Sequence, residues 1–450
     1  MDTKTHRQSN NALIIFTREP VAGHTKTRLM PYLSGEQCAD LHLCFLHDIV
    51  KEAVKTDADI CVSYTGGEPQ ELRRVFGENA AYREQIGDDL GAKMLNAIRA
   101  VIDSGYSKVV LIGTDIPEIC TESICKAFDA LDRSDVVIGP TEDGGYYLIG
   151  MKKTYEGAFK VKKYGSGTVL DDTVKSIRED GLTVSFADAY MDIDTREDIQ
   201  SYCRRMRLDE RLQNTETGKF LAENIPISVI IPTYNESASI INMMDQLEEY
   251  RNQAEIIFVD GGSSDDTVEK IGDRYTVIRS GKGRAVQMNT AAEKCCGDII
   301  FFLHCDSKLP ENAIAEVRRC MTSNAYGCFG VRFESRNFFM WTNRIISNHR
   351  AWKRGLPFGD QGIFIDRKLF FEVGMFPELP IMEDYEFGRR LVACGIKPGK
   401  TAEPITTSSR RYGKGTIGIL KTEYKMWNLR RLYRKGLSID EISEMYRDIR

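Results

Sequence analysis

A chain of 450 residues with 42% hydrophobic and 28% charged residues is typical of a folded protein of two or three domains, not of a disordered or fibrous one. Its formal net charge of −5 argues against a general nucleic-acid partner, because such proteins are usually basic. No apolar run reaches the roughly 20 residues that span a bilayer, and the polar start MDTKTHRQSN lacks the apolar segment of a signal peptide. We therefore expect a cytoplasmic protein.

The twelve cysteines do not form a recognisable framework. None lies in a Cys-x-x-Cys pair, and several lie inside apolar runs. This pattern indicates reduced, mostly buried thiols in a cytosolic protein rather than disulfides. We interpret the neighbours Cys295 and Cys296 as ordinary residues at a helix end rather than as a redox pair.

Strand-like and helix-like segments alternate along the first half of the chain. Strands are predicted at residues 12–17, 60–63, 108–113 and 136–139, and helices at 35–55, 90–102, 121–131 and 169–180. This alternation is typical of an α/β domain with a mainly parallel sheet. A polar, charge-dense tract at 204–224 follows, and we place a linker at 214–224, between domains at 1–213 and 225–450.

A second α/β series begins after this tract. Apolar, β-branched runs at 227–231, 255–259 and 299–303 predict buried parallel strands, with helices at 238–250, 267–271 and 284–293. Each strand is followed by polar residues, at the sheet edge where such folds bind nucleotides. These residues are, in order, the PTYNE segment with Pro232, Tyr234 and Glu236, the VDGGSSDDT segment with Asp260 and Gly261, and the LHCDS segment with His304 and Asp306.

The chemistry of these groups points to a nucleotide and a metal. An aspartate such as Asp260 accepts hydrogen bonds from a base or ribose, and the glycines after it permit close backbone approach. The carboxylate of Asp306 suits Mg²⁺ or Mn²⁺ bound together with substrate phosphates. His304 is a further candidate ligand that would favour Mn²⁺. A single strand that ends in Asp is common, so the prediction depends on all three strand ends in order.

The ordered run PTYNE, VDGGSSDDT, GKGRAVQMNTA, HCDS, GDQGIFI and MEDYEFGRRL, over residues 227–435, resembles glycosyltransferase family 2. It is most similar to the branch called radical-SAM/selenodomain-associated transferase 2. The resemblance implies a GT-A fold, nucleotide contacts at Asp260 and its neighbours including Lys282, a metal-diphosphate site at Asp306, an acceptor side at Gly359, Asp360 and Gln361, and a base from the pair Glu383 and Asp384.

Two points qualify the family pattern. The tripeptide HCD around Cys305 stands where the family usually has a metal-binding Asp-x-Asp, so only one carboxylate remains there. Glu383 and Asp384 open a predicted helix, where acids also serve as ordinary first-turn residues. Inverting transfer needs a carboxylate within reach of the acceptor hydroxyl, and GDQ at 359–361 lies upstream in the order that the family shows. We choose Asp384 of this pair as the base.

The first half carries its own charged motifs. The strand NALIIFT leads into REPVAGHTKTRL, whose cations Arg18, Lys26 and Arg28 suit a di- or triphosphate, although a solvated basic loop is the alternative. The loop is not a Walker A motif, because Gly-Lys-Ser/Thr is absent. Candidate metal ligands are Asp115 in LIGTDIP and Asp194 in MDIDT, with Asp192 as a further one. The turn Asp143-Gly144-Gly145 either admits a sugar or phosphate or is a plain tight turn.

Together, TKTRL, GTDIP, EDGGYY and DIDT over residues 11–202 resemble the radical-SAM/selenodomain-associated transferase 1 family. That family is similar to the guanylyltransferases that activate molybdopterin or phospholactate and share a GT-A-like fold. One departure is Gly-Ser-Gly-Thr at 165–168, where the family has Trp-Ser-Thr before the last helix.

The sequence thus predicts two Rossmann-like GT-A domains, each a mainly parallel sheet flanked by helices. We expect a bifunctional transferase in which the second domain passes a sugar from a nucleotide-sugar donor to a small-molecule acceptor, and the first binds a nucleotide or NTP and makes the donor or transfers a sugar itself. Two alternatives stay open. In one, the first domain is a degenerate scaffold. In the other, the chain is a membrane-surface transferase with a lipid acceptor, bound through residues 410–435, where Arg and Lys alternate with Tyr and Trp. We favour an amphipathic helix packed on the second domain over that membrane surface.

Overall fold

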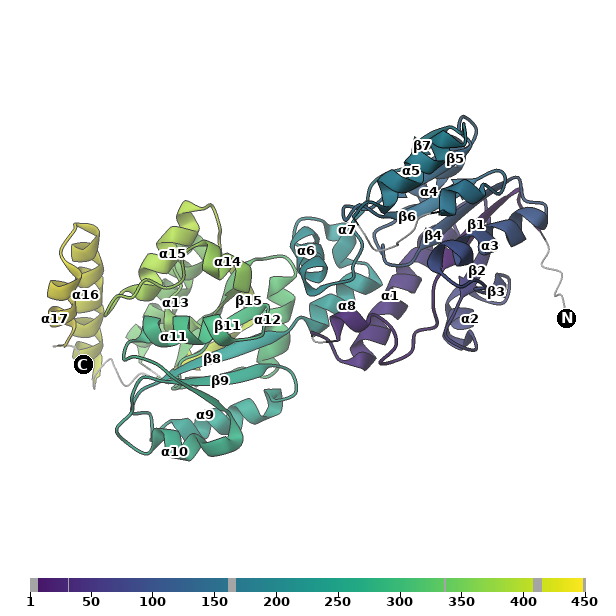
Figure 1. The fold of residues 1–450 in the computed structure, drawn as a ribbon. Coiled ribbons are helices and arrows are strands. Elements are labelled where there is room, and N and C mark those ends of the chain that lie inside the picture. The colour runs from purple at the N-terminus through teal and green to yellow at the C-terminus, as the bar shows by residue number, and fades with distance from the viewer. Residues whose placement is uncertain (1–6, 31, 161–166, 336, 408–414, 448–450) are drawn as a thin grey trace. The chain divides into compact units, whose positions relative to one another are not determined.

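The structure is a computed structural model that describes residues 7–30, 32–160, 167–335, 337–407 and 415–447. The chain divides into two compact units (Figure 1). Unit 1 holds residues 1–205 and 209–221, and unit 2 holds 206–208 and 222–450. Residues 165, 166 and 410–414, which belong to two of the motifs above, lie outside the described residues.

Unit 1 contains a seven-stranded sheet with the order β3-β2-β1-β4-β6-β5-β7. The neighbours β3-β2-β1-β4 are parallel, and β6 is antiparallel to both β4 and β5. The strands are β1 (Asn11–Phe16), β2 (Asp59–Tyr64), β3 (Ala81–Glu84), β4 (Lys108–Gly113), β5 (Val136–Pro140), β6 (Tyr146–Met151) and β7 (Val184–Phe186).

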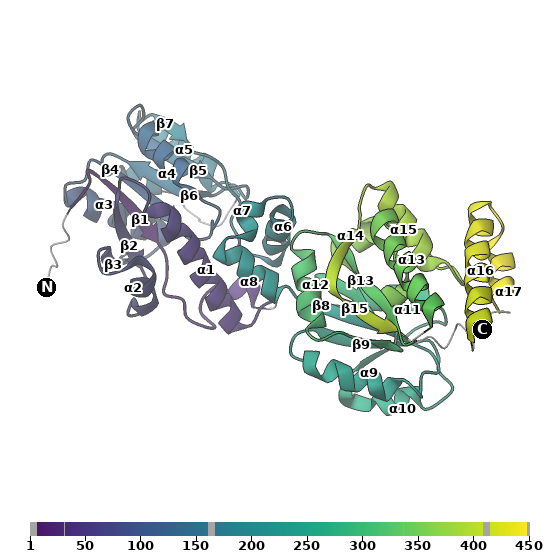
Figure 2. The ribbon, with the colours of Figure 1, turned by 180° about the vertical axis from the view of Figure 1, so that it is seen from behind.

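Helices cover both faces of this sheet (Figures 1 and 2). Successive residues of β1 point to opposite faces, so that Leu13 and Ile15 pack with α1, α2 and α4, while Ile14 packs with α3 and α5. The helices of this unit are α1 (Gly35–Ala53), α2 (Gln70–Phe76), α3 (Leu90–Asp103), α4 (Thr121–Ala130), α5 (Val169–Glu179), α6 (Arg196–Met206), α7 (Glu210–Gln213) and α8 (Glu216–Asn224).

The tract predicted to hold the linker is helical over most of its length. Helix α8 begins at Glu216, and the carboxylate of Asp48 on α1 accepts hydrogen bonds from the backbone N–H groups of Glu216 (2.8 Å) and Thr217 (2.9 Å). The carboxylate thereby satisfies two of the N–H groups that a helix start leaves unpaired. The polar composition of the tract therefore reflects short surface helices.

Unit 2 contains an eight-stranded sheet with the order β10-β9-β8-β11-β14-β13-β15-β12. As in unit 1, four parallel strands come first and are followed by an antiparallel neighbour, here β14 beside β11. The strands are β8 (Ile227–Thr233), β9 (Glu255–Asp260), β10 (Thr276–Arg279), β11 (Ile299–Phe302), β12 (Ser307–Lys308), β13 (Tyr326–Phe333), β14 (Ile363–Asp366) and β15 (Gly399–Thr407).

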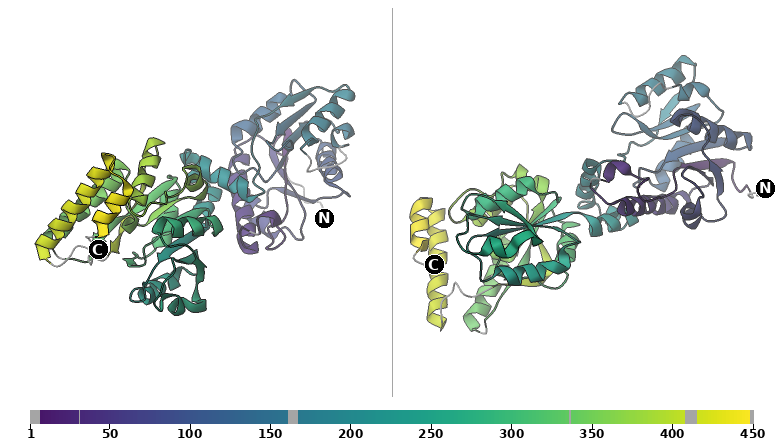
Figure 3. Two further views of the ribbon diagram at one scale, coloured as in Figure 1. Left: turned by 60° about the vertical axis from the view of Figure 1, so that its left-hand side comes forward. Right: turned by 60° about the horizontal axis from the view of Figure 1, so that its bottom comes forward.

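Helices also flank this second sheet (Figure 3). They are α9 (Ile240–Leu247), α10 (Thr267–Ile271), α11 (Arg284–Lys294), α12 (Ala313–Met321), α13 (Phe338–Arg354), α14 (Arg367–Glu372), α15 (Glu383–Ala393), α16 (Gly415–Arg434) and α17 (Ile439–Arg447). The predicted fold class, two Rossmann-like GT-A units with mainly parallel sheets flanked by helices, is confirmed. Among the described helices, none is both long and apolar enough to cross a membrane.

Candidate active sites

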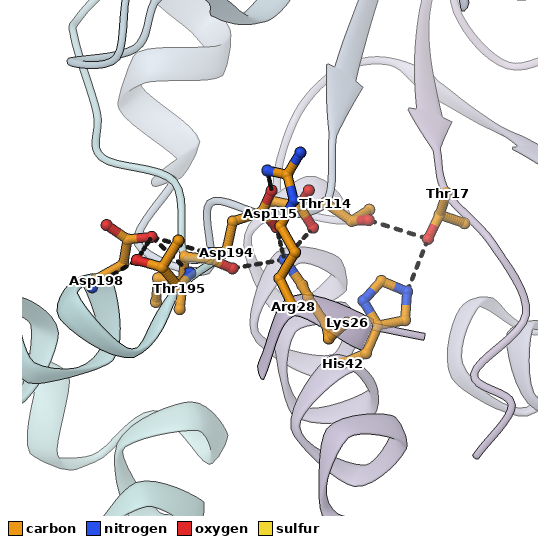
Figure 4. Close-up of polar contacts among 10 residues, drawn as sticks. Thr17, Lys26, Arg28, His42, Thr114, Asp115, Asp194, Thr195 and Asp198 are labelled. Carbon is orange, nitrogen blue, oxygen red and sulfur yellow. Dashed lines mark hydrogen bonds and ion pairs between the residues drawn. The ribbon is translucent and has the colours of Figure 1, made fainter. Parts of the chain in front are cut away.

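In unit 1, the parallel strands β1 and β4 end side by side, which brings the residues after them together. The hydroxyl of Thr17, after β1, lies 3.0 Å from that of Thr114, after β4, and 3.2 Å from Nε2 of His42 on α1 (Figure 4). His42 is buried, and this burial is the main reason why its pKa falls to about 4. Its imidazole is therefore neutral near pH 7.

Lys26 links three distant segments of unit 1 (Figure 4). Its Nζ lies 2.6 Å from Oδ1 of Asp115 and 3.0 Å from Oδ1 of Asp194, and it donates to the carbonyl of Ile193 at 2.6 Å. The side chain is only 4% exposed, and the backbone of Lys26 is left-handed at φ 51°. A short 3-10 turn follows directly at Thr27–Leu29. The strained backbone of Lys26 therefore lies at the point where the chain turns, with its ammonium buried.

The charges of this cluster stabilise one another. Burial by itself lowers the pKa of Lys26, but the carboxylates of Asp115 and Asp194 raise it above its usual value. Burial likewise raises the pKa of Asp115, and the ammonium of Lys26 outweighs it, so that this carboxyl has a lowered pKa. Lys26 and Asp115 are therefore both charged near neutral pH.

The segment that carries Asp194 is held by its own turn. Asp198 Oδ2 accepts hydrogen bonds from the N–H groups of Asp194 (3.0 Å) and Thr195 (2.7 Å) and from the Thr195 hydroxyl (2.8 Å). Arg28 also reaches Asp194, with 3.3 Å between NH1 and Oδ2, but its side chain is 73% exposed. Asp194 thus has a fixed position, whereas Arg28 retains freedom to contact a ligand.

The Asp143 turn has a tight internal geometry. Asp143 Oδ1 accepts from the N–H of Gly145 (2.9 Å) and the hydroxyl of Thr141 (2.6 Å). Gly144 has φ 87°, and a Cβ there would lie 2.2 Å from the carbonyl oxygen of Gly167, so that only glycine fits. Nearby, burial and the charges of Asp143 and Asp194 raise the pKa of Asp192 to about 6.

A cleft of about 790 Å³ joins these groups. This volume lies within the range of small-molecule sites. Its lining includes Arg18, Lys26, Arg28, Asp115, Asp143, Gly145, Asp192 and Asp194, which are all but one of the residues singled out in this half. The other, Gly144, shapes the turn behind it.

A metal fits this cleft only after a rearrangement. The position between Asp115 and Asp194 already holds the Lys26 ammonium. Within the described residues, no group of three or more His, Cys, Asp or Glu side chains is arranged to hold a metal ion. In this conformation, the two carboxylates bind an internal cation.

In unit 2, β8 and β9 run parallel and pair Thr233 with Asp260 at their ends. Asp260 is buried, and its carboxylate accepts from the N–H groups of Gly262 (3.1 Å) and Ser263 (3.1 Å). These bonds hold the loop that begins with Gly261 in a fixed turn. The carboxylate is therefore positioned by the backbone that follows it.

The PTYNE segment packs on this loop. Lys282 Nζ donates to the Tyr234 hydroxyl (3.0 Å) and lies 4.2 Å from the centre of the Tyr234 ring. The carboxylate of Glu236 accepts from the hydroxyl of Ser239 at 2.6 Å, whereas Pro232 is still part of β8. Tyr234 and Lys282 thus form an exposed aromatic-cation pair beside Asp260.

The HCDS segment follows β11. Asp306 is exposed, whereas Nε2 of His304 is buried. A Cβ on Gly359 would lie 2.4 Å from that Nε2, so the imidazole packs against the Gly359 backbone. Asp306 thus lies on the solvent side of this segment, whereas the His304 ring packs toward the Gly359 loop.

The acids of α15 lie next to this segment. Asp384 Oδ2 accepts from the N–H of Gly359 at 2.8 Å, so His304, Gly359 and Asp384 form one contiguous group. Glu383 is buried, with 3.5 Å between its Oε1 and NH1 of Arg284 on α11. Burial lowers the pKa of Arg284, but Glu383, Asp384 and other acids raise it overall. The two acids therefore differ: Glu383 anchors an arginine, and Asp384 is partly exposed.

The residues of the GDQ segment do not share one environment. Gln361 is fully buried, and its side-chain oxygen accepts from Arg350 (3.2 Å) and from the N–H of Phe358 (3.3 Å). Gly359 and Asp360 are partly exposed. Gln361 therefore supports the loop from behind rather than lining its solvent side.

Three groups at these sites were missed by the sequence analysis. Arg284 and Asp198 each contact a candidate residue, and His42 lines the unit 1 cleft and contacts Thr17. Arg284 directly follows Gly283 in the quoted GKGRAVQMNTA run, which was the available signal. His42 lies within a helix and gave no such signal.

Comparisons with known proteins support both halves of this description. Residues 49–166 match the family described as "Uncharacterized protein conserved in bacteria (DUF2064)". Residues 228–376 match "Glycosyl transferase family 2". The 2-phospho-L-lactate guanylyltransferase of Methanothermobacter thermautotrophicus is 26% identical over 180 residues, which are 39% of this chain and 77% of that protein. That of Methanosphaera stadtmanae is 24% identical and covers 48% and 92%.

Among solved structures, a protein of Desulfovibrio desulfuricans described as a candidate nucleotide-diphospho-sugar transferase is 31% identical. The match covers 48% of this chain and 95% of that protein, with a TM-score of 0.46. By sequence identity, the chain belongs to the same family as this protein. A mannosyltransferase from Pyrobaculum calidifontis, solved with GDP-Man and Mn²⁺, is 19% identical over 50% of this chain and 69% of its own, with a TM-score of 0.34. The two predicted family resemblances are confirmed, and the second family model and the curated relatives of the first half are named as transferases.

Proposed function

We propose that the chain is a bifunctional transferase. Unit 2 transfers a sugar from a nucleotide-sugar donor to a small-molecule acceptor. Unit 1 binds a nucleotide and acts either as a nucleotidyltransferase that makes the donor or as a second glycosyltransferase. The observation that carries the proposal is the contiguous group His304, Gly359 and Asp384 at the sheet edge of unit 2, with the exposed Asp306 two residues after His304.

The reaction in unit 2 follows from these positions. The acceptor hydroxyl attacks the anomeric carbon, the bond from that carbon to the diphosphate breaks, and the hydroxyl proton passes to Asp384. The Gly359 N–H holds one carboxylate oxygen, which fixes the direction of the base. Arg284 lies 3.5 Å from Glu383 and so places a positive charge beside the acids of α15. A Mg²⁺ or Mn²⁺ ion held by Asp306 would neutralise the departing diphosphate when bound.

In unit 1, the cleft supplies the cations that phosphates need. The Arg28 side chain is exposed at the cleft, where it can meet a phosphate, and Arg18 also lines the cleft. Lys26 joins them if phosphates draw its ammonium away from Asp115 and Asp194, which would then be free to bind Mg²⁺ or Mn²⁺. The guanylyltransferase relatives favour nucleotidyl transfer over glycosyl transfer in this unit.

A degenerate, scaffolding unit 1 is the rival proposal. The paired charges argue against it. A structural domain gains little from a buried lysine held at the wall of a 790 Å³ cleft by two partly exposed carboxylates. An abandoned cleft would sooner fill with apolar side chains than keep this ion cluster.

The products of the full chain distinguish these functions. The chain is incubated with Mn²⁺ or Mg²⁺ and either NTPs with sugar 1-phosphates or preformed nucleotide sugars. Pyrophosphate release that is lost in Lys26→Met, and nucleoside diphosphate release that is lost in Asp306→Ala, are the expected results. If neither product forms with any base, and both variants stay folded, the proposal is wrong.

A further inference from the structure

Helix α13 exposes a row of large apolar side chains. Phe338, Trp341, Ile345 and Ile346 are all exposed although the helix is part of unit 2. Their spacing of three, seven and eight residues places them on one face. The opposite face buries Met340, Ser347 and Ala351, and the helix packs on β13. The apolar row therefore belongs to the outer side of a well-anchored helix.

Helix α16 repeats this arrangement. Ile417, Leu420, Tyr424 and Trp427 are exposed at spacings of three, seven and ten residues, so they also share a face. Ile419 and Leu429 of the same helix are buried. The rings of Tyr424 and Trp427 stack with centroids 6.0 Å apart, as do those of Phe338 and Trp341 at 5.7 Å.

The two helices are joined at their N-terminal ends. The side-chain amide of Asn337, which caps α13, donates to the hydroxyl of Thr416 at 3.2 Å. Ile419 of α16 packs with Met340 of α13 in a small apolar cluster. The eight exposed apolar residues of both helices and the exposed cations Lys353, Lys421, Arg431 and Arg434 are called the aromatic-basic surface below. The C-terminal helices are shown in Figure 3.

The charge of these helices is opposite to that of the chain. The protein as a whole has a formal net charge of −5. In α13 and α16 the only acid is Glu423, against the cations Arg344, Arg350, Lys353, Arg354, Lys421, Lys425, Arg430, Arg431 and Arg434. Several of these cations are exposed, among them Lys353, Lys421, Arg431 and Arg434. The acids of α17, Asp440, Glu441 and Glu444, lie on the next helix.

We propose that the aromatic-basic surface binds the surface of an anionic lipid bilayer. Exposed Trp, Phe, Ile and Leu side chains on a helix face flanked by Lys and Arg are the combination that inserts at the boundary of headgroups and acyl chains. A second copy of the chain is a poorer occupant, because a twofold interface would place these cations against their own copies. The aliphatic Ile345, Ile346, Ile417 and Leu420 also have no stacking role toward a nucleic acid.

Helix α16 also contacts the acceptor-side elements of unit 2. Arg430 lies over the Phe358 ring at 5.4 Å, and Tyr433 packs edge-on against Tyr385, next to Asp384. Membrane binding does not depend on the transferase proposal, because the surface and its charge are independent of the chemistry. If both proposals hold, the helix that binds the bilayer, α16, also supports the acceptor loop.

Tryptophan fluorescence tests the proposal directly, because two of the three tryptophans, Trp341 and Trp427, lie on this surface. The third, Trp352, is packed with Lys400 at 4.3 Å from its ring. The full chain is titrated with phosphatidylcholine vesicles containing 30% phosphatidylglycerol. We expect a blue shift that Trp352→Phe retains and the double variant Trp341→Phe/Trp427→Phe loses. Vesicles of phosphatidylcholine alone should give a much weaker response.

Co-sedimentation then measures the contribution of each feature. Lys421→Glu/Arg431→Glu should weaken binding to the anionic vesicles by at least about 25-fold, since each cation near the surface contributes about fivefold. Val54→Ser, an exposed apolar residue of unit 1, is the matched control and should bind like the unchanged chain. Circular dichroism verifies that each variant is folded.

Three results would overturn the proposal. The first is absence of sedimentation with anionic vesicles at low salt. The second is binding that all surface variants retain. The third is a dimer that Trp341→Ala/Trp427→Ala dissociates while no vesicle binding is seen, which would assign the surface to a second copy of the chain.

Discussion

The two candidate sites lie at corresponding edges of their sheets but arrange their charges in different ways. In unit 1, Lys26 is bonded to both Asp115 and Asp194, so the cation and the acids of the cleft satisfy one another. In unit 2, Asp260 and Asp384 are held mainly by backbone N–H groups, and Asp306 is exposed. The acids of unit 2 are thus positioned by the backbone, whereas those of the unit 1 cleft are paired with an internal cation that a bound metal ion would have to replace.

The largest effect is expected from Asp306→Ala. If this carboxylate holds the metal-diphosphate, its loss should lower donor turnover by at least about 10³-fold, because the metal contributes several kcal/mol to the transition state. Nucleoside diphosphate release measures this effect. Lys308→Ala, also exposed and two residues away, is the control. Turnover within twofold of the unchanged chain would remove Asp306 from the site.

Asp384→Asn tests the base in the pre-arranged site. The amide keeps the shape of the side chain but accepts no proton, so kcat should fall by about 10²–10⁴-fold with little change in donor affinity. Glu386→Gln on the same helix, whose carboxylate contacts Arg389 and Tyr433, should retain most activity. A variant that loses donor affinity with kcat intact would make Asp384 a positioning residue.

Lys26→Met tests the internal cation of unit 1. Without the ammonium, Asp115 and Asp194 lose the cation that they share, so Mn²⁺ should bind them about tenfold or more tightly in the absence of nucleotide. Electron paramagnetic resonance of free Mn²⁺ gives the bound fraction. Arg28→Met is the control, and its exposed, longer contact predicts a smaller change. Equal Mn²⁺ binding by all three proteins would contradict the exchange.

The smallest effect concerns acid stability. The pKa of His42 is lowered to about 4 in the folded state against 6.5 for an ordinary histidine. Between pH 4 and 6.5 the unfolded chain binds a proton at His42 and the folded chain does not, so protonation favours unfolding. The contribution of His42 to the free energy of unfolding is therefore complete above pH 6.5 and is lost as the pH falls toward 4. At pH 5.5 the free energy of unfolding should be about 1 kcal/mol lower than above pH 6.5 for this reason. In His42→Gln that share of the pH dependence should vanish in denaturant titrations, whereas the exposed His47→Gln should keep it.

The strands that carry the sites could be predicted from the sequence. Apolar, β-branched runs mark β1, β4, β8, β9 and β11, and the polar residues after them meet because the strands are parallel. The antiparallel strands β6, β13 and β14 were not predicted. Glycines and aromatic residues interrupt the apolar pattern of β6 and β13, and β14 is only four residues long. Their position in the sheet depends on pairing between distant segments.

The side-chain partners at the sites could not be predicted in the same way. Lys26 and Asp194 are separated by 168 residues, and only the folded chain brings the loop after β1 onto the segment before α6. Gln361 follows Gly359 and Asp360 in one motif, but the turn points it into the core. Motif order indicates which residues share an edge, whereas the turns decide which of them face solvent.

The central claim is that the chain holds two separate nucleotide sites, and calorimetric titration of the full chain tests it most directly. GTP, CTP, UTP, GDP-mannose and UDP-N-acetylglucosamine are titrated with Mn²⁺ into the unchanged chain, Lys26→Met and Asp306→Ala. We predict two classes of binding site, one lost in Lys26→Met alone and the other lost in Asp306→Ala alone. A single class of site, or binding that neither variant alters in a folded protein, would contradict the account.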